Sequence, residues 1–180
     1  MVDYNKIIGQ YYTTGSELHS LLVIHSHRVA ELACILAVRR DLDIDLNFVR
    51  EAAMLHDIGI FLTDAPRIHC YGEKPYIAHG VEGSQLLLEL GLPQHALVCE
   101  RHTGAGLSLD EIVRQRLPLP HRDLLPVTLE EKLICYADKF FSKTRPDQQK
   151  TYERARRSLE SFGSATLARF DALTTLFGIP

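Results

Sequence analysis

The sequence lacks the features that mark several large classes of protein. Its four cysteines are scattered, with no C-x-x-C pair, and most lie in apolar stretches (Cys34, Cys70, Cys99 and Cys135). We therefore expect reduced thiols in the core rather than disulfides or a cysteine-based metal site. No signal peptide precedes the first polar residues, and no apolar run approaches about 18 residues. A cytoplasmic protein without a membrane-spanning segment is the expectation.

The chain also lacks a strong excess of either charge. Its 180 residues include 20 lysines and arginines against 23 aspartates and glutamates, which gives a net charge of −3, and its pI is near 6.3. This balance argues against a general nucleic-acid-binding or membrane-binding protein, although it allows a small phosphorylated ligand in a local basic pocket. The length suits one domain with a sizeable core.

No segment alternates polar and apolar residues as a β-strand would, whereas helical periodicity recurs throughout. The expected helices cover residues 2–12, 16–40, 46–57, 76–90, 93–102, 148–161 and 164–176, with two more beginning after Ser108 and Thr128. Capping-box spacings (Thr14 with Glu17, Ser108 with Glu111, Thr128 with Glu131) and Asp45 mark helix starts. Gly59 is expected to end one helix in a left-handed conformation, and the proline-containing stretches 63–75 and 116–126 are expected to be loops. We predict an all-α, single-domain helical bundle.

Six histidine and aspartate residues stand in apolar helical surroundings: His25, His56, Asp57, His79, His102 and Asp138. A single histidine of this kind is more often a hydrogen-bonded core residue than a ligand. Burying several imidazoles and carboxylates without a shared partner would be very costly, however. A metal ion is such a partner, and nitrogen and carboxylate donors suit Fe, Mn, Zn, Co or Ni better than Mg or Ca.

The order His25, His56-Asp57, Asp138 resembles the H…HD…D signature of the HD-domain superfamily of metal-dependent phosphohydrolases. HDIG at 56–59 matches the HDIG variant of that signature, and HSHRVAELA at 25–33 resembles the first metal-binding helix of the family. His79 and His102 resemble the two further histidines of dinuclear members such as bacterial symmetrical diadenosine-tetraphosphate hydrolases. ERHTGAG and LEEKLICYADKF are closer still to small uncharacterised HDIG proteins.

The resemblance divides the chain into an N-terminal helix (1–15), an HD domain (16–145) and a C-terminal helical extension packed on it (146–180). The sequence lacks the GYP motif of the branch specific for cyclic di-GMP. It has Ile60 where several diadenosine-tetraphosphate hydrolases carry a lysine, so the resemblance does not imply that substrate.

The resemblance further implies a divalent transition metal, as one or two ions. His25, His56, Asp57 and Asp138 would bind the first, and His79 and His102, with Asp57 bridging, would bind the second. The implied reaction is hydrolysis of a phosphate ester or anhydride of a nucleotide or similar small molecule by metal-bound hydroxide. The candidate catalytic residues are Asp57, Arg28 and Lys139. The candidate substrate-binding residues are Arg28, Arg101, Thr103 and Lys139.

Several alternatives remain open from the sequence. Arg28, Arg101 and Lys139 are each equally compatible with a solvated surface position or an ion pair. The segment 63–75, with Arg67, His69 and Lys74, either lies over the pocket or is an ordinary surface loop. The same ligand set also suits a di-iron HD-type oxygenase or a non-catalytic nucleotide-binding HD module. The basic run 152–160 is either a solvated face or a contact between subunits, which leaves a homodimer open.

Overall fold

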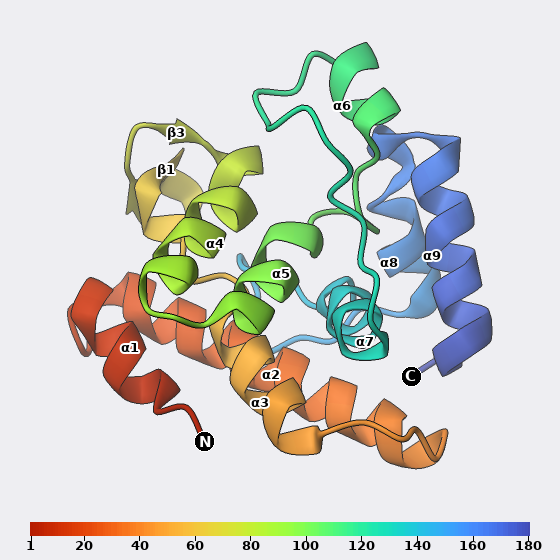
Figure 1. Ribbon diagram of the computed structural model, residues 1–180, viewed down its shortest axis with the longest axis horizontal. Helices are drawn as coiled ribbons and strands as arrows, with labels where there is room; N and C mark the ends of the chain where they lie inside the picture. The colour runs from red at the N-terminus through yellow and green to blue at the C-terminus, as the bar shows by residue number, and fades with distance from the viewer.

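Nine α-helices and four short 3₁₀-helices make up most of the computed structural model, which describes residues 1–180 (Figure 1). The α-helices are α1 (Tyr4–Tyr11), α2 (Glu17–Arg39), α3 (Leu46–Leu55), α4 (His79–Glu89), α5 (Pro93–Arg101), α6 (Leu109–Arg114), α7 (Leu129–Asp138), α8 (Tyr152–Arg157) and α9 (Ser164–Phe177). The 3₁₀-helices are Ile60–Leu62, Pro66–Ile68, Tyr76–Ala78 and Glu160–Phe162.

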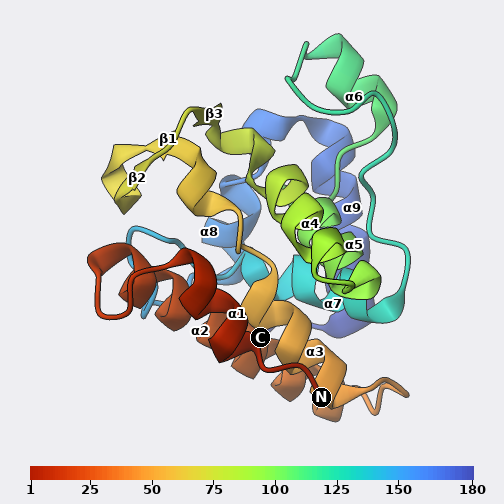
Figure 2. The same cartoon turned by 60° about the vertical axis from the view of Figure 1, so that its left-hand side comes forward.

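Helices α2, α3, α5 and α7 form the centre of the molecule. Helix α2 packs against α3 and α7, and α5 packs against α3, α4 and α7. Helices α4 and α5 lie side by side in both views (Figures 1 and 2). Fully buried side chains such as Val29, Ala52 and Leu133 join α2, α3 and α7 in one apolar core. Because burial of apolar surface is the main stabilising contribution, this core fixes the relative positions of the helices that carry the candidate ligands.

The C-terminal segment packs on the outer side of α7 (Figure 1). Phe170 and Phe177 of α9 lie against the buried ring of Tyr136, with ring centroids 5.3 and 5.7 Å apart. The helix expected over 148–161 is shorter than predicted, since Thr151 caps α8 by accepting a hydrogen bond from the backbone N–H of Arg154. A separate 3₁₀-helix covers Glu160–Phe162. The domain boundaries at residues 15 and 145 stay predictions.

Most of the expected helix starts are present in the structure. The carboxylate of Asp45 caps α3, Thr128 caps α7, and Ser108 forms a complete capping box with Glu111. The prediction at Thr14 is wrong, because the hydroxyl of Ser16 accepts the hydrogen bond from the backbone of His19 instead. Gly15, with a φ of 83°, forms a turn between Thr14 and the helix, so the cap moves to the residue after that turn.

The all-α prediction is approximate, because a small three-stranded sheet lies within the expected loop 63–75. Strand β1 (Thr63–Ala65) pairs antiparallel with β2 (Cys70–Tyr71) and parallel with β3 (Lys74–Pro75). Strands of two or three residues are too short to show alternating hydrophobicity. Gly72 lies so close to the backbone of Leu62 that a Cβ atom would overlap it, which explains the glycine there.

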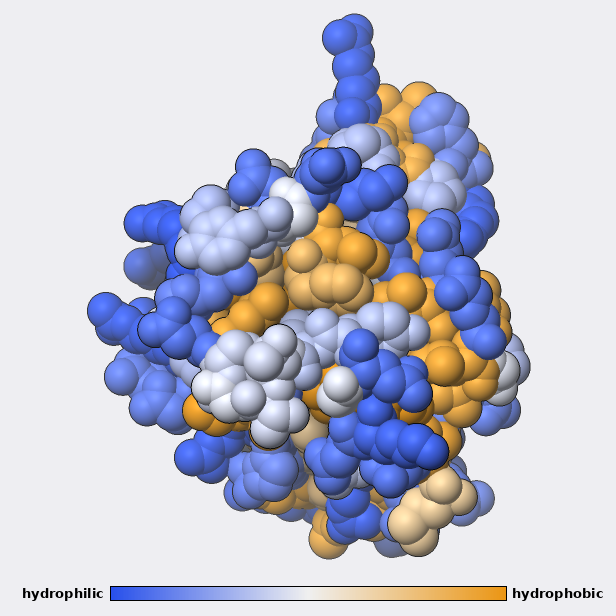
Figure 3. All heavy atoms as spheres, turned by 90° about the vertical axis from the view of Figure 1, so that its left-hand side faces the viewer, coloured by the Kyte–Doolittle hydropathy of each residue, from blue (hydrophilic) through white to orange (hydrophobic).

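One helix is long and apolar enough to cross a membrane by length and composition, namely α2. The expectation of no such segment rested on uninterrupted apolar runs, which miss a helix whose mean hydropathy reaches 1.6. Half of that apolar window is buried inside the fold, and a buried core helix passes the same test. On the face shown in Figure 3, hydrophilic residues cover most of the surface and hydrophobic residues form a band between them.

Candidate metal centre

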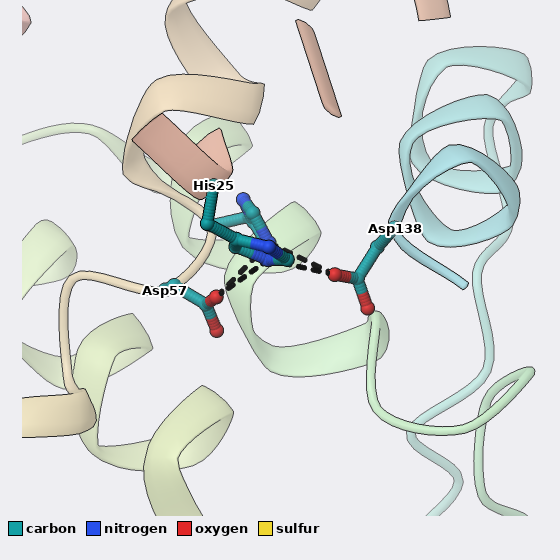
Figure 4. A group of neighbouring side chains, drawn as sticks. His25, Asp57 and Asp138 are labelled. Carbon is teal, nitrogen blue, oxygen red and sulfur yellow. Dashed lines mark ion pairs between the residues drawn. The ribbon is translucent and has the colours of Figure 1, made fainter. Parts of the chain in front are cut away.

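Six histidine and aspartate side chains from five helices or their ends converge in the interior. They are His25 within α2, His56 and Asp57 directly after α3, His79 at the start of α4, His102 directly after α5, and Asp138 at the end of α7. Each residue is at most 7% exposed. Figure 4 shows His25, Asp57 and Asp138 pointing toward one another from three segments of the chain. All six residues predicted as metal ligands therefore lie in one buried cluster.

The first group of ligand atoms consists of His25, His56, Asp57 and Asp138. The Nε2 atom of His25 lies 3.1 Å from Oδ2 of Asp57 and 3.0 Å from Oδ1 of Asp138. The Nε2 atom of His56 lies 3.3 and 3.5 Å from the same two oxygens. One nitrogen or oxygen from each residue therefore faces a common point, with all four atoms within 4.8 Å of one another.

The second group consists of Asp57, His79 and His102. The Oδ1 atom of Asp57 lies 3.3 Å from Nε2 of His79 and 3.4 Å from Nε2 of His102. Asp57 thus directs Oδ2 toward the first group and Oδ1 toward the second. A carboxylate placed in this way can bind a different cation through each oxygen.

The histidines in the cluster are oriented by backbone carbonyl groups. The Nδ1 atoms of His56, His79 and His102 lie 2.6, 2.7 and 2.6 Å from the carbonyl oxygens of Ala53, Tyr76 and Cys99. Because a carbonyl oxygen only accepts hydrogen bonds, each Nδ1 carries a proton and each Nε2 points into the cluster, where it offers a lone pair whenever the ring is neutral. This orientation is typical of metal-binding histidines.

Two of these lone pairs face each other directly. Nε2 of His79 lies 3.0 Å from Nε2 of His102, and two bare acceptors at that distance repel unless a cation lies between or beside them. Elsewhere in the cluster, Nε2 of His25, Nε2 of His56 and Oδ1 of Asp57 are buried without a hydrogen-bond partner. Buried nitrogen and carboxylate oxygen atoms without a hydrogen-bond partner are suitable ligand atoms for a divalent transition metal.

The pKa values of most candidate ligands favour the deprotonated ligand atom that metal binding requires. Burial lowers the pKa of His79 to about 3 and also lowers that of His102, so both rings are neutral at pH 7. Burial raises the pKa of Asp57, but Lys143 and His56 outweigh it and hold that pKa well below the usual value. Burial lowers the pKa of His56, whereas Asp57 and Asp138 together raise it to about 9. A bound metal would replace that last proton.

Gly59 brings the two groups together. It does not end α3 in a left-handed conformation as predicted, because its φ is −87°. Instead, α4 crosses so close that a Cβ atom on Gly59 would overlap the backbone of His79 and Gly83. The glycine of HDIG therefore allows the first turn of α4, which carries His79, to approach Asp57.

Replacement of Gly59 by alanine is expected to destabilise the protein by about 3 kcal/mol, because the added methyl group must displace backbone rather than a flexible side chain. The matched control is Gly9→Ala in α1, where nothing lies within 4 Å of the new methyl group. There alanine should stabilise the helix by about 0.5–1 kcal/mol. Urea unfolding of both variants measures the difference. Equal stability of the two would contradict the assigned role of Gly59.

A cavity of about 450 Å³, which we call the metal cavity, opens onto the cluster. His79, His102 and Asp138 form part of its wall, with Thr103 and Gly104 beside them. Its cationic lining residues are Arg67, Lys139, Lys143 and Lys150, and its apolar ones include Ile68, Phe141, Leu159 and Phe162. The cavity therefore brings several positive charges and several apolar side chains close to the candidate metal ligands.

The comparison with known protein families assigns most of the chain to one family. Residues 22–142 match the HD domain. The chain belongs to the HD-domain family. HD domains form a superfamily of metal-dependent phosphohydrolases that bind divalent metals, and the cluster built from His25 to Asp138 could hold such a metal in this member.

Three relatives are similar over different parts of their length. An uncharacterised protein of Methanocaldococcus jannaschii is 38% identical over 69% of this chain and 68% of its own length. A tRNA (cytidine(56)-2'-O)-methyltransferase of Thermoplasma volcanium is 31% identical over 87% of this chain but only 43% of its own. The corresponding enzyme of Picrophilus torridus is 34% identical over 56% of this chain and 26% of its own. No solved structure matches the chain.

Two lysines lie beside the candidate metal ligands. Nζ of Lys139 lies 2.6 Å from Oδ2 of Asp138 and donates a hydrogen bond to the carbonyl oxygen of His102. Nζ of Lys143 lies 2.7 Å from Oδ2 of Asp57 and 5.9 Å from the ring centre of Tyr76. The sequence reasoning missed Lys143, which follows α7 in an irregular segment without periodicity. The one indication in the sequence that Lys143 lies near the site is its position five residues after Asp138.

The C-terminal extension completes the cavity of the HD domain. Lys150, Ser158, Leu159 and Phe162 belong to its wall. From α9, the guanidinium group of Arg169 donates hydrogen bonds to the carbonyl oxygens of Ala105 and Gly106, at 3.1 and 2.9 Å. The extension therefore both lines the cavity and holds the glycine-rich segment beside His102.

The structure does not bring two of the candidate residues to the cavity. Arg28 is exposed, its guanidinium pairs with Glu31, and its side chain lines a different cavity. The guanidinium of Arg101 pairs with the buried carboxylate of Glu131 at 2.9 Å. By contrast, Lys139 and Thr103 line the metal cavity.

The segment 63–75 contributes to the cavity in part. Arg67 lines it, as do Ala65 and Pro66. His69 instead pairs with Glu17, and Lys74 lies 3.6 Å from Glu82. Only the centre of this segment therefore lines the cavity beside the candidate metal ligands.

Proposed function

We propose that this HD domain is a dinuclear metal-dependent phosphohydrolase that acts on a small phosphorylated molecule such as a nucleotide. The placement of Asp57 carries the proposal, because each of its oxygens faces a separate group of ligand atoms. His25, His56 and Asp138 would bind one ion with Asp57, and His79 and His102 would bind the other. Bound divalent ions would polarise a phosphoryl oxygen and supply a nucleophile from water at neutral pH.

The chain itself would bind and stabilise the reacting phosphoryl group. Negative charge on phosphoryl oxygens is stabilised by fixed cations in a water-poor site, and Lys139 and Lys143 offer two ammonium groups next to the ligands. Arg67 and Lys150 add charge farther along the same wall. Leu159 and Phe162 form an apolar surface suited to the non-phosphate part of a substrate.

A panel of phosphorylated compounds tests the proposal. The panel contains nucleoside mono-, di- and triphosphates and dinucleoside polyphosphates, each with Mn, Co, Ni, Zn or Fe(II). Because two relatives are named as tRNA methyltransferases, it also contains RNA ending in a 2'- or 3'-phosphate. We expect metal-dependent hydrolysis of at least one small molecule, monitored by chromatography of the products and abolished by a chelator. Metal-loaded protein that hydrolyses none of them, or that consumes oxygen with an organic substrate instead, would contradict the proposal.

A further inference from the structure

A second, smaller cavity adjoins the metal cavity. It has a volume of about 350 Å³, and all seven of its lining residues are polar (Ser142, Thr144, Arg145, Gln148, Gln149, Lys150 and Arg154). Ser142, Thr144 and Lys150 also line the metal cavity. We call this second cavity the arginine groove. The two cavities therefore lie next to each other.

The arginine groove is positively charged and contains no carboxylate. Three of its lining residues are cationic, and neither Arg145 nor Arg154 has a carboxylate within 4 Å, whereas Arg156 and Arg169 nearby are paired with Asp171 and Glu111. The acidic neighbour in sequence, Asp147, lines a different cavity. In a chain with a net charge of −3, such a concentration of unpaired cations is a local feature that attracts anions.

Lys150 connects the arginine groove to the metal cavity. Its ammonium group donates a hydrogen bond to the carbonyl oxygen of Lys139 at 3.1 Å and pairs with no carboxylate. Burial lowers the pKa of Lys150, and the nearby cations Lys139, Lys143 and Arg154 lower it further, against the opposite effect of Asp138. The cations along this wall therefore repel one another, and an anion bound between them would relieve that repulsion.

We propose that the arginine groove binds a second phosphate group of the substrate whose reacting phosphoryl group lies at the metal centre. The preferred substrates are then compounds with at least two phosphate groups rather than simple phosphomonoesters. This inference rests on the proposed function for the reacting group. Three cations in a groove of this size fit one or two phosphates, whereas a nucleic-acid backbone requires a longer basic surface.

A series of diphosphonates tests the groove without any turnover, because their P–C bonds are not hydrolysed. The full-length protein, at measured metal content, is titrated calorimetrically with α,ω-alkanediphosphonates of one to six carbons and with the matching alkanephosphonates. We compare the wild type with the double variant Arg145→Ala/Arg154→Ala. The control is Arg157→Ala, an exposed arginine on α8 that lines neither cavity.

The wild type should bind the best diphosphonate at least about tenfold more tightly than its single-phosphonate partner, as expected for added charge-assisted hydrogen bonds. In the double variant this advantage should fall to about twofold or less, and in Arg157→Ala it should persist. An unchanged advantage in the double variant, or none in the wild type, would overturn the inference. The inference would also be overturned if the wild type bound an RNA oligonucleotide without terminal phosphates tightly and the double variant did not.

The two proposals fail in distinguishable ways. If no compound is hydrolysed but the diphosphonate preference depends on Arg145 and Arg154, the groove is correct and the proposed reaction is wrong. If hydrolysis occurs but the preference does not depend on these arginines, the reaction stands and the groove is wrong. Circular dichroism of the double variant checks the fold, which we expect to persist because neither side chain is in an ion pair.

Discussion

Replacement of Asp57 by asparagine is expected to remove both metal ions and the hydrolytic activity together. Asparagine keeps the size of the side chain but loses the negative charge that both groups of ligands share. Bound metal ions stabilise a transition state by several kcal/mol. With a value of about 4 kcal/mol, their loss lowers the activity by roughly a thousandfold. Elemental analysis and initial-rate measurements on the same preparation check both parts of the expectation.

The control for this variant is Asp110→Asn. Asp110 is an exposed carboxylate of α6 that pairs with Arg114, so its loss should change neither metal content nor rate. The fold of Asp57→Asn should persist by circular dichroism, because the helices are held by the apolar core. A variant that keeps its full metal content would show that Asp57 is not the shared ligand.

Replacement of Lys143 by methionine is expected to lower kcat by about a hundredfold while metal binding persists or tightens. The ammonium group lies 2.7 Å from Oδ2 of Asp57, the oxygen that faces the first group of ligand atoms, so its charge opposes that of an ion bound there. Removing that charge favours metal binding but removes a cation beside the reacting phosphoryl group. Methionine preserves most of the side-chain volume, so packing against Tyr76 changes little.

Metal titration and steady-state kinetics separate the two effects of Lys143→Met. The exposed lysine of α1 provides the control, because Lys6→Met removes the same charge far from the cavity. Loss of metal in Lys143→Met would mean that the lysine positions Asp57 as a ligand rather than stabilising the substrate. An unchanged kcat would remove Lys143 from the proposed machinery.

The convergence of the six candidate ligands could be predicted from the sequence, because each of them stands in its own apolar helical surroundings. A buried polar residue there needs a partner, so six such residues pointed to one shared cause, and the ordered motif from His25 to Asp138 supplied the family. The helix caps at Asp45 and Ser108 were predictable for a similar reason, since a cap depends on residues within one turn.

The surroundings of the cluster could not be predicted in the same way. The orientation of Arg28 depends on which partner a long, flexible side chain finds, and here that partner is Glu31 at the surface. Lys143 and all of the arginine groove except Arg154 lie in the irregular segment between α7 and α8, where position in sequence does not determine the direction of a side chain. Gly59 was assigned to a helix end, whereas the reason for it is a close contact with α4 that only the tertiary structure shows.

The number of metal ions per chain tests the central claim most directly. Elemental analysis of the reconstituted wild-type protein, alongside the variants His79→Gln and His102→Gln, measures it. The account predicts about two ions in the wild type and about one in each variant, because His25, His56, Asp57 and Asp138 still form the first group. One ion in all three proteins would contradict the dinuclear centre, and no ion in any of them would contradict the metal centre itself.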